Sequence, residues 1–205
     1  MLAAHDYDMR GDRWGDLQKL ARGRPVWMTE WCARGDDESP GQINSGTAYA
    51  SAMHDAFTGG ANVWMAYDWV YPPRQGGEAL VHVDWGNKYA LTKLYYGYRQ
   101  WCAPLAPGMR VVTTSLDDIA PSAVKATAFL SADGKRLVAH VANTSDESAN
   151  LTIDPGPGFS NSTARRVRTS AEENIAKLPD ATRAEWEKPA PLPPRSMNTW
   201  EWVRE

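Results

Sequence analysis

The sequence predicts an α/β first half followed by an all-β second half, and two patterns of hydrophobic residues support this division. Up to about residue 105, short apolar runs alternate with amphipathic helical segments, which is typical of parallel strands connected by helices. From residue 109 onward the apolar runs are short, β-branched and separated by turn sequences, which is typical of an antiparallel β-sandwich. We therefore expect one domain over 1–105 and a second over 106–205.

The first half contains three successive strand-and-helix segments. Each apolar run is followed by residues at helical spacing, and Gly59-Gly60 provides a stop for the second helix, because glycine accepts the left-handed backbone at a helix end. Pro104 and Pro107 end the third helix. The expected strands lie over 2–7, 25–29 and 62–67, the expected helices over 12–21, 43–58 and 87–102, and a long loop over 70–86.

The second half is predicted to consist of short strands joined by tight turns. Turn sequences such as Ala132-Asp133-Gly134 separate the apolar runs, and the proline-rich segment 189–194 is expected to be a stiff connector into the last strand. The expected strands lie over 110–114, 124–130, 137–142, 151–153, 164–169 and 199–203.

Composition excludes several classes of function. The 205 residues carry a net charge of −3, which argues against nucleic acid or an anionic membrane surface as the main partner. No apolar run approaches the ~18 residues that cross a bilayer, so no membrane span is expected. Two cysteines cannot form a disulfide-rich scaffold, and the sequence contains no four-ligand zinc spacing. The first residues lack a basic segment and a long apolar stretch, so we expect no signal peptide in this chain.

The aromatic residues are unevenly distributed. Of 10 Trp, 8 Tyr and 3 Phe, sixteen fall in residues 1–109 and five in the remaining 96. Such a concentration predicts either a large core or a surface on which flat ligands stack. Because the charge disfavours nucleobases, sugars are the flat ligands that this sequence favours.

Three strand ends carry the residues from which chemistry is expected. Glu30 ends the second strand between Trp27 and Trp31, and the carboxyl ends of parallel strands form the functional face of such sheets. A partly apolar cleft there can tune a carboxylate, although the spacing alone favours a solvated or salt-bridged glutamate at a strand end. His5 and Tyr7 lie two apart at the end of the first strand, where both can reach one face or pack internally. Trp64 on the third strand fits either a core position or a sugar-stacking one.

These segments, taken in order, resemble the carboxy-terminal part of glycoside hydrolase family 30, which includes glucosylceramidase-, glucuronoxylanase- and β-1,6-glycanase-like enzymes. His5-x-Tyr7 is similar to the sixth strand of that family's (β/α)8 barrel, and Val26–Trp31, which contains WMTE, is similar to the seventh. Gly60–Trp69 is similar to the eighth strand. The segments 95–100, 106–108 and 192–199 resemble the final barrel helix, the entry into the side domain and its last strand.

The resemblance implies a fold, an activity and a set of site residues. It implies the last three β/α units of a (β/α)8 TIM barrel over 1–105 and a β-sandwich side domain over 106–205. Glu30 stands at the position of the nucleophile of a retaining β-glycosidase, and His5 and Tyr7 would hold it or a substrate hydroxyl. Trp64 would stack on the sugar at the cleavage point. The resemblance implies no metal or organic cofactor, because carboxyl groups carry out both the protonation and the nucleophilic attack. The expected walls of neighbouring subsites are Trp31, Tyr67, Trp69 and Trp85.

A complete barrel needs about 250 residues, so most of one is missing here. The family's general acid/base glutamate belongs to an Asn-Glu pair that this sequence lacks, and Asp6, Asp68 and Asp84 match no family position. We therefore expect the carboxy-terminal portion of a longer, secreted or periplasmic enzyme that acts on a β-linked glycan, inactive without its amino-terminal barrel portion. A non-catalytic carbohydrate-binding module or pseudoenzyme, and a structural or interaction protein, are the alternatives. Cys32 is expected to be free and partly buried.

Overall fold

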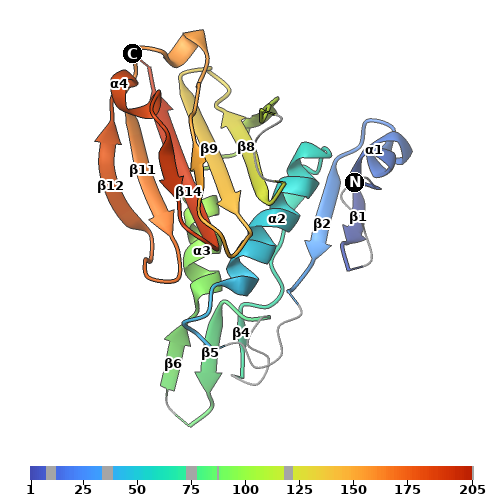
Figure 1. Cartoon of the computed structure of the whole chain (residues 1–205). Coiled ribbons are helices and arrows are strands. Elements are labelled where there is room, and N and C mark those ends of the chain that lie inside the picture. The colour runs from blue at the N-terminus through green and yellow to red at the C-terminus, as the bar shows by residue number, and fades with distance from the viewer. Residues whose placement is uncertain (8–12, 34–38, 73–77, 87, 118–121, 205) are drawn as a thin grey trace. The chain divides into compact units, whose positions relative to one another are not determined.

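The computed structural model describes residues 1–7, 13–33, 39–72, 78–86, 88–117 and 122–204. Its fold is mixed α/β with several sheets (Figure 1). The chain divides into two compact units, Met1–Tyr95 and Tyr96–Glu205, and the division falls within helix α3 (Lys93–Cys102).

The first unit is built on a parallel sheet of three strands in the order β1-β2-β3. The strands are β1 (Leu2–His5), β2 (Val26–Glu30) and β3 (Val63–Trp64), joined by α1 (Trp14–Ala21) and α2 (Asn44–Thr58). All three predicted strands and the first two predicted helices are present. The third strand is shorter than the predicted 62–67, because pairing with β2 involves only Val63 and Trp64.

The core of this unit explains why α2 ends at its glycines. Tyr49, Met53 and Ala56 form a fully buried stripe on α2, as the helical spacing predicted. A Cβ atom on Gly59 would lie 2.2 Å from the Cβ of Trp14, and Gly60 has a φ of +101°. Both positions therefore require glycine, one for close approach to α1 and one for backbone conformation.

The predicted loop over 70–86 and the predicted helix start at Asn87 are wrong. The segment contains β4 (Val70–Tyr71) and β5 (Val81–Asp84), and β6 (Lys88–Leu91) pairs antiparallel with β5. Asn87 itself lies outside the described residues. The helix begins only at Lys93, because the Thr92 hydroxyl accepts a hydrogen bond from the backbone N–H of Tyr95 (3.0 Å) and so caps the first turn.

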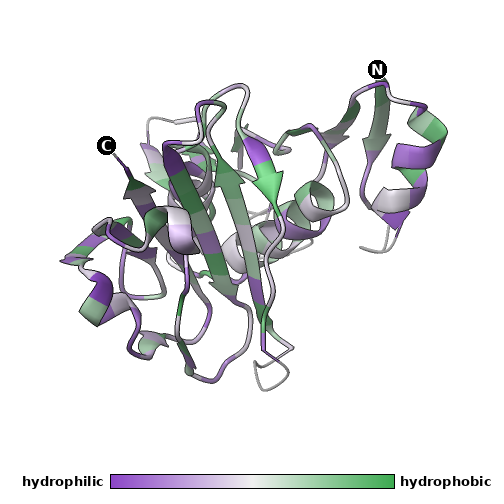
Figure 2. Ribbon diagram, turned by 90° about the horizontal axis from the view of Figure 1, so that it is seen from above, coloured by the Kyte–Doolittle hydropathy of each residue, from purple (hydrophilic) through white to green (hydrophobic). Residues whose placement is uncertain are grey.

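The second unit contains an antiparallel sheet of six strands in the order β12-β11-β14-β9-β8-β7 and a two-stranded sheet, β10-β13. Hydrophobic residues dominate the central strands, with hydrophilic ones at strand ends and turns (Figure 2). The strands of the large sheet are β7 (Arg110–Val112), β8 (Val124–Leu130), β9 (Arg136–Asn143), β11 (Ala164–Thr169), β12 (Ala176–Ala181) and β14 (Ser196–Val203). The small sheet pairs β10 (Ala149–Leu151) with β13 (Ala190–Leu192), and the unit also holds a short 3-10 helix (Pro157–Phe159) and α4 (Arg183–Trp186).

Two strands of this unit were not predicted. β12 contains Pro179 and lies at one edge of its sheet, where a missing N–H is tolerated. β13 occupies the segment expected to be a connector, and its Pro191 sits opposite Asn150 in a two-stranded sheet. Because proline is unfavourable in strands, its presence in a sequence argues against predicting one. These two strands form nevertheless, because edge positions tolerate a residue without an N–H group.

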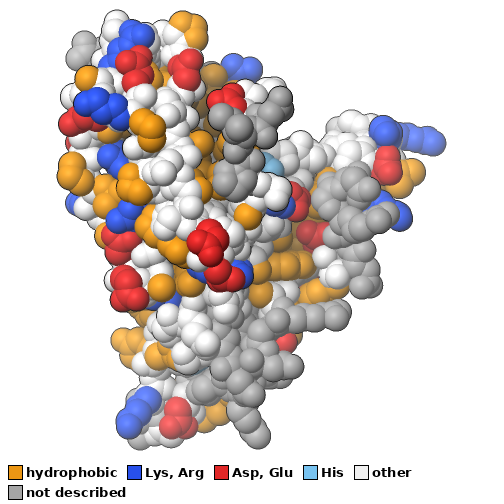
Figure 3. All heavy atoms as spheres, viewed as in Figure 1, with side chains coloured by type: hydrophobic (Ala, Val, Ile, Leu, Met, Phe, Trp, Pro, Cys, Tyr) orange, Lys and Arg blue, Asp and Glu red, His pale blue; other side chains and the backbone are white. Residues whose placement is uncertain are grey.

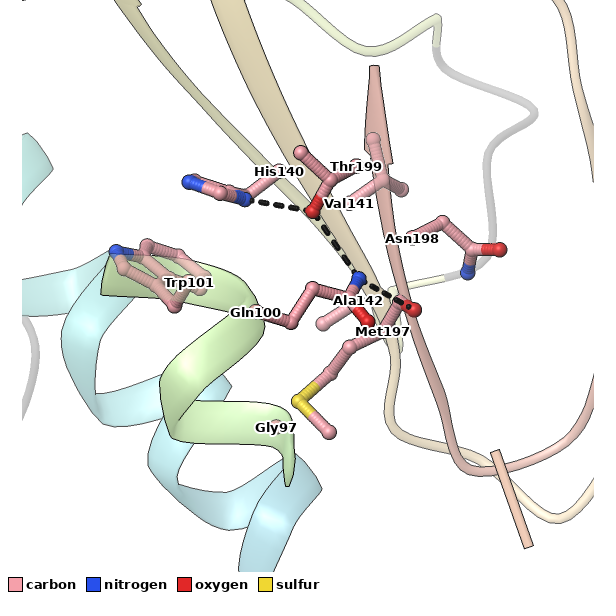
Figure 4. Close-up of a pocket in the computed structure, with 9 residues that line it drawn as sticks. All are labelled: Gly97, Gln100, Trp101, His140, Val141, Ala142, Met197, Asn198 and Thr199. Atoms are coloured by element: carbon pink, nitrogen blue, oxygen red, sulfur yellow. Dashed lines mark hydrogen bonds between the residues drawn. The ribbon is translucent and has the colours of Figure 1, made fainter. Parts of the chain in front are cut away.

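The large sheet has a packed core on each face. On one face, buried apolar residues cluster, with Trp186, Trp200 and Trp202 as the largest members. On the other, the last turns of α3 place Trp101 parallel to His140, with ring centroids 4.4 Å apart (Figure 4). Gln100 Nε2 donates to the Met197 carbonyl and to Thr199 Oγ1, both at 3.0 Å, so the buried amide of Gln100 is satisfied.

The distribution of charged side chains on the surface agrees with the small net charge of the sequence. Basic and acidic side chains are interspersed over the face of the second unit in Figure 3. Within the described parts of the chain, no helix is both long and apolar enough to cross a membrane.

The second unit is expected to lose stability in acid through His140. Burial lowers the pKa of His140 to about 3, opposed in part by the Trp101 backbone, whereas an unfolded histidine titrates near 6.5. Below about pH 6.5 the unfolded chain binds a proton at His140 that the folded chain excludes. The free energy of unfolding is therefore unaffected by His140 above about pH 6.5, and it falls as the pH drops toward 3.

Thermal unfolding followed by circular dichroism between pH 7 and 4 tests this. The melting temperature of the unchanged chain should fall more steeply with acid than that of His140→Gln. Thr127→Ser provides the matched control, because Thr127 is buried opposite His140 on β8 and carries no group that titrates in this range, so its pH dependence should equal that of the unchanged chain. Equal slopes for His140→Gln and the unchanged chain would contradict the prediction.

Candidate functional site

Glu30 lies at the carboxyl end of β2, beside the end of β1. The register of these two parallel strands shifts between Ala4 and His5, so His5 pairs with Glu30 rather than with Thr29. Such an irregularity re-aims the side chains that follow it. His5 Nδ1 consequently lies 3.7 Å from Glu30 Oε1, and the Glu30 side chain keeps 35% of its surface exposed.

Tyr7 holds the same carboxylate. Its hydroxyl donates a hydrogen bond to Glu30 Oε1 (3.0 Å) and lies 3.8 Å from Cys32 Sγ. Burial, together with the hydrogen bonds to Cys32 and Glu30, raises the pKa of Tyr7 above its ordinary value. Tyr7 therefore stays protonated at neutral pH and remains a donor to Glu30.

Trp31, Tyr49 and Trp64 form an aromatic cluster. Ring centroids are 4.9 Å apart for Trp31 and Tyr49, 5.2 Å for Tyr49 and Trp64, and 5.9 Å for Trp31 and Trp64. Trp64 is only 7% exposed in the described structure, and Trp31 is partly buried. These contacts combine edge and tilted geometries that aromatic rings favour.

Tyr49 on α2 was not predicted as a site residue. Its hydroxyl donates to the carbonyl oxygens of Trp31 (3.2 Å) and Tyr67 (2.6 Å), and so ties together the chain that follows β2 and the chain that follows β3. In the sequence Tyr49 is one apolar position on a helix face, because periodicity shows the direction of a side chain but not the reach of its hydroxyl. Cys32 is buried and forms no disulfide bond within the described residues.

The other predicted site residues follow β3. Tyr67 N–H donates to the Trp31 carbonyl (3.0 Å), and Trp69 accepts at its carbonyl from Val81 N–H (3.0 Å). Tyr67 is 38% exposed and Trp69 is 61% exposed. Trp85 lies in the turn after β5 and is 77% exposed. The structure thus brings His5, Tyr7 and Glu30 together directly.

Asp6 lies between His5 and Tyr7 in the sequence and differs from them in its surroundings. It is buried, and burial together with the negative charge of Asp55 on α2 raises the pKa of Asp6 to about 6. Within the described segments, no cluster of three or more His, Cys, Asp or Glu residues could hold a metal ion.

Comparison with known proteins supports a relationship in fold. No protein-family model matches this chain, and a search of curated proteins finds no match. Among solved structures, a conserved exported protein from Bacteroides fragilis matches with a TM-score of 0.74 and 19% identity, over 97% of this chain and 45% of that one. A glycoside hydrolase family 30 endoxylanase from Clostridium papyrosolvens matches with a TM-score of 0.71 and 21% identity, over 99% and 48%.

A third match is a family 30 subfamily 8 xylanase from Clostridium acetobutylicum, with a TM-score of 0.68 and 22% identity over 91% of this chain and 45% of that one. The fold of the chain is therefore similar to the carboxy-terminal part of glycoside hydrolase family 30 enzymes. The chain spans slightly less than half the length of these three proteins. At these identities the similarity concerns the fold.

Removing the Glu30 charge should lower the pKa of Tyr7. The carboxylate accepts the Tyr7 proton in a hydrogen bond and repels a phenolate, so Glu30→Gln removes two of the causes that raise this pKa. Alkaline titration of ¹³C-tyrosine-labelled protein by NMR, with Tyr7 assigned from Tyr7→Phe, measures the shift. Glu78→Gln is the control, and an unchanged Tyr7 titration in Glu30→Gln would show that the contact does not form.

Asp6→Asn should stabilise the first unit at neutral pH. The pKa of Asp6 is about 6 in the folded chain and 3.8 ordinarily, so the carboxyl loses its proton more easily when the chain is unfolded. Ionisation of Asp6 therefore opposes folding fully above about pH 6, and it has no effect below about pH 4. We expect a gain of roughly 2 kcal/mol at pH 7.5 that disappears at pH 4, measured by urea unfolding. The exposed Asp16→Asn should change stability by less than about 0.5 kcal/mol. Destabilisation by Asp6→Asn at both pH values would contradict the prediction.

Proposed function

We propose that this chain is the carboxy-terminal portion of a retaining β-glycoside hydrolase that cleaves O-glycosidic bonds of a β-linked glycan or glycoside. The observation that carries the proposal is the carboxylate of Glu30, which stands partly exposed at the end of a parallel strand, accepts a hydrogen bond from Tyr7 and lies beside His5. The fold similarity to family 30 enzymes supports the same class of activity.

In this proposal Glu30 is the nucleophile. Its carboxylate oxygen forms a bond to the anomeric carbon while the bond to the leaving oxygen breaks, and water later hydrolyses the glycosyl ester. Tyr7 donates its hydrogen bond to one oxygen of Glu30, which holds the carboxylate in one orientation. His5 lies close enough to assist in orienting Glu30 or a substrate hydroxyl.

The remaining parts of the proposal extend to the whole protein. β1, β2 and β3 would correspond to strands six to eight of a (β/α)8 barrel over 1–105, with a β-sandwich side domain over 106–205. The residues that would contact the substrate are Trp31, Trp64, Tyr67, Trp69 and Trp85. The general acid/base glutamate would come from an amino-terminal barrel portion outside this sequence, so the chain alone would not hydrolyse ordinary β-glycosides. Export of the whole protein accords with the exported Bacteroides fragilis neighbour.

Mechanism-based labelling tests the nucleophile without the acid/base glutamate. A 2,4-dinitrophenyl 2-deoxy-2-fluoro-β-glycoside loses dinitrophenolate, a leaving group that needs no proton, and its fluorine slows hydrolysis of the glycosyl ester. Incubation of the chain with the xylose and glucose forms should add one fluorosugar to the peptide that contains Glu30, detected by mass spectrometry.

The Glu30→Gln variant should remain unlabelled, and Glu78→Gln should be labelled like the unchanged chain. A label on another residue, or a label that persists in Glu30→Gln, would refute the role of Glu30. No labelling of the unchanged chain by either sugar would refute the nucleophile and favour a non-catalytic carbohydrate-binding module.

A further inference from the structure

A groove of about 280 Å³ lies within the second unit, between the end of α3 and one face of the large sheet. The charged side chains that line it are Arg99, Arg136, Arg165 and Glu201, and we call it the arginine groove. Three arginines against one glutamate leave a local excess of two positive charges, in a chain whose net charge is −3. The groove therefore differs in sign from the protein as a whole.

Strand register explains why the charged residues of the sheet meet on one face. Arg165 on β11 pairs with Glu201 on β14, and residues directly opposite each other in an antiparallel pair point to the same face. Glu201 also pairs with Val138 on β9. Arg136 lies two residues before Val138, so the alternation of side chains along β9 puts Arg136 on that face as well.

Helix α3 supplies the opposite wall of the groove. Its last turns lie over the same face of the sheet, where Gln100 Nε2 donates to Thr199 Oγ1, two residues before Glu201 on β14 (Figure 4). Arg99 precedes Gln100 on the helix and lines the groove from this side. The guanidinium groups thus come from three elements that are far apart in the sequence.

Only one of the three arginines is neutralised by a carboxylate. Arg136 Nε donates to Glu201 Oε1 in an ion pair whose two side chains are largely buried. Arg99 and Arg165 are exposed, and their guanidinium groups form no hydrogen bond or ion pair with any residue that the structure describes. Two unpaired guanidinium groups therefore line one cavity.

Simple solvation of exposed arginines is the ordinary alternative. Elsewhere in this unit, however, Arg168, Arg183 and Arg195 each form an ion pair with a carboxylate. Arg99 stands in the last turn of α3, where the carbonyl end of the helix favours a cation. That effect explains Arg99 but gives no reason for a second unpaired guanidinium, Arg165, on the sheet across the groove.

A further cation lies on the neighbouring edge strand. Lys177 on β12 is directly opposite Val167, a lining residue of the groove, so its side chain projects from the same face of the sheet. Lys177 is exposed and forms no ion pair with the described residues. The positive charge thus continues beyond the groove toward the edge of the sheet.

The remaining lining of the groove is mostly apolar. Ile175 has a φ of +50°, a left-handed conformation that a β-branched residue rarely adopts, and its N–H donates to Thr169 Oγ1 (3.0 Å). Backbone conformations of this kind cluster at ligand-binding sites, where the surrounding contacts hold them. The apolar lining residues are Ala103, Pro104, Val167 and Ile175.

The chemistry of the arginine groove favours a phosphate monoester. Guanidinium groups bind phosphate oxygens through paired, charge-assisted hydrogen bonds. A phosphate monoester carries a charge of about −1.5 to −2 at neutral pH, which matches two unpaired arginines, whereas a single carboxylate carries only one charge. The volume of the groove equals that of about nine water molecules, so a small organic group fits beside the phosphate and contacts the apolar lining.

Two macromolecular occupants fit less well. A nucleic acid needs an extended basic stripe, whereas here the unpaired arginines gather around one cavity of a chain with a net negative charge. An acidic protein segment also pairs with arginine, but it distributes single charges along its length. The groove instead brings its two unpaired guanidinium groups to one place.

We propose that the arginine groove is a binding site for a small phosphate monoester such as a sugar phosphate, whose phosphoryl group pairs with Arg99 and Arg165. Arg136, held by Glu201, adds a third guanidinium to the wall. All of these residues belong to the second unit, so the inference is independent of the role proposed for Glu30.

Isothermal titration calorimetry of the full 205-residue chain at low ionic strength tests this inference, with glucose 6-phosphate as the probe. The double variant Arg99→Gln/Arg165→Gln should bind it at least about tenfold more weakly, because charge-assisted hydrogen bonds to the phosphate are lost. Arg165→Lys keeps the charge but not the planar fork, so its affinity should lie between those of the unchanged chain and the double variant.

The matched control Arg110→Gln/Lys88→Gln also removes two positive charges, at exposed positions outside the groove, and should bind glucose 6-phosphate like the unchanged chain. Melting temperatures of all variants should agree, because the substituted side chains are exposed. Gluconate, which has one negative charge, should bind at least about threefold more weakly than glucose 6-phosphate. Inorganic phosphate should also bind more weakly, because it has no organic part to contact the apolar lining.

Absence of glucose 6-phosphate binding, or equal binding by the double variant, would overturn the inference. An equal loss in the control would show that the net charge of the chain, and not the groove, attracts the anion. Gluconate or inorganic phosphate binding as tightly as glucose 6-phosphate would identify a carboxylate or free phosphate as the ligand. Binding of a hexaglutamate peptide without binding of glucose 6-phosphate would assign the groove to an acidic protein segment.

Discussion

The pairing of β1 with β2 is the interaction on which the candidate site depends. Both strands are parallel, so their carboxyl ends meet at one edge, and the shift in register between Ala4 and His5 sets His5 opposite Glu30. Tyr7 then reaches the same carboxylate from just beyond the strand. Without this shift the side chains at the end of β1 would be aligned one position differently, and in a strand one position reverses the face.

The buried layer beneath that edge supports the arrangement. Val26 and Met28 on β2 are fully buried, whereas Glu30 at the strand end keeps part of its surface exposed. Tyr49 on α2 bonds the chain after β2 to the chain after β3. The helix thus does more than cover the sheet, because one of its hydroxyls joins two segments that carry candidate substrate-binding residues.

The second unit buries polar side chains against an antiparallel sheet. His140 is kept neutral by burial against Trp101, and Gln100 finds partners for its amide on β14 and for its carbonyl oxygen on Thr169. Trp101 and Gln100 both come from the last turns of α3, so this helix supplies an apolar ring and a satisfied polar group to the same face of the sheet.

Sequence by itself determined the order of elements and the strand ends at which polar residues gather. Periodicity located β1, β2, α1 and α2, and it placed Glu30 at the end of its strand, because these segments alternate or repeat clearly. It failed where proline or polar residues occupy edge strands, as in β12 and β13, and where β5 and β6 replaced an expected loop and helix start. Only the tertiary structure decided that Tyr7 bonds Glu30, that the buried Asp6 carboxyl is affected by the charge of Asp55 and that Trp64 is largely buried. Register shifts and the reach of side chains depend on contacts between segments far apart in the chain, and local sequence does not encode such contacts.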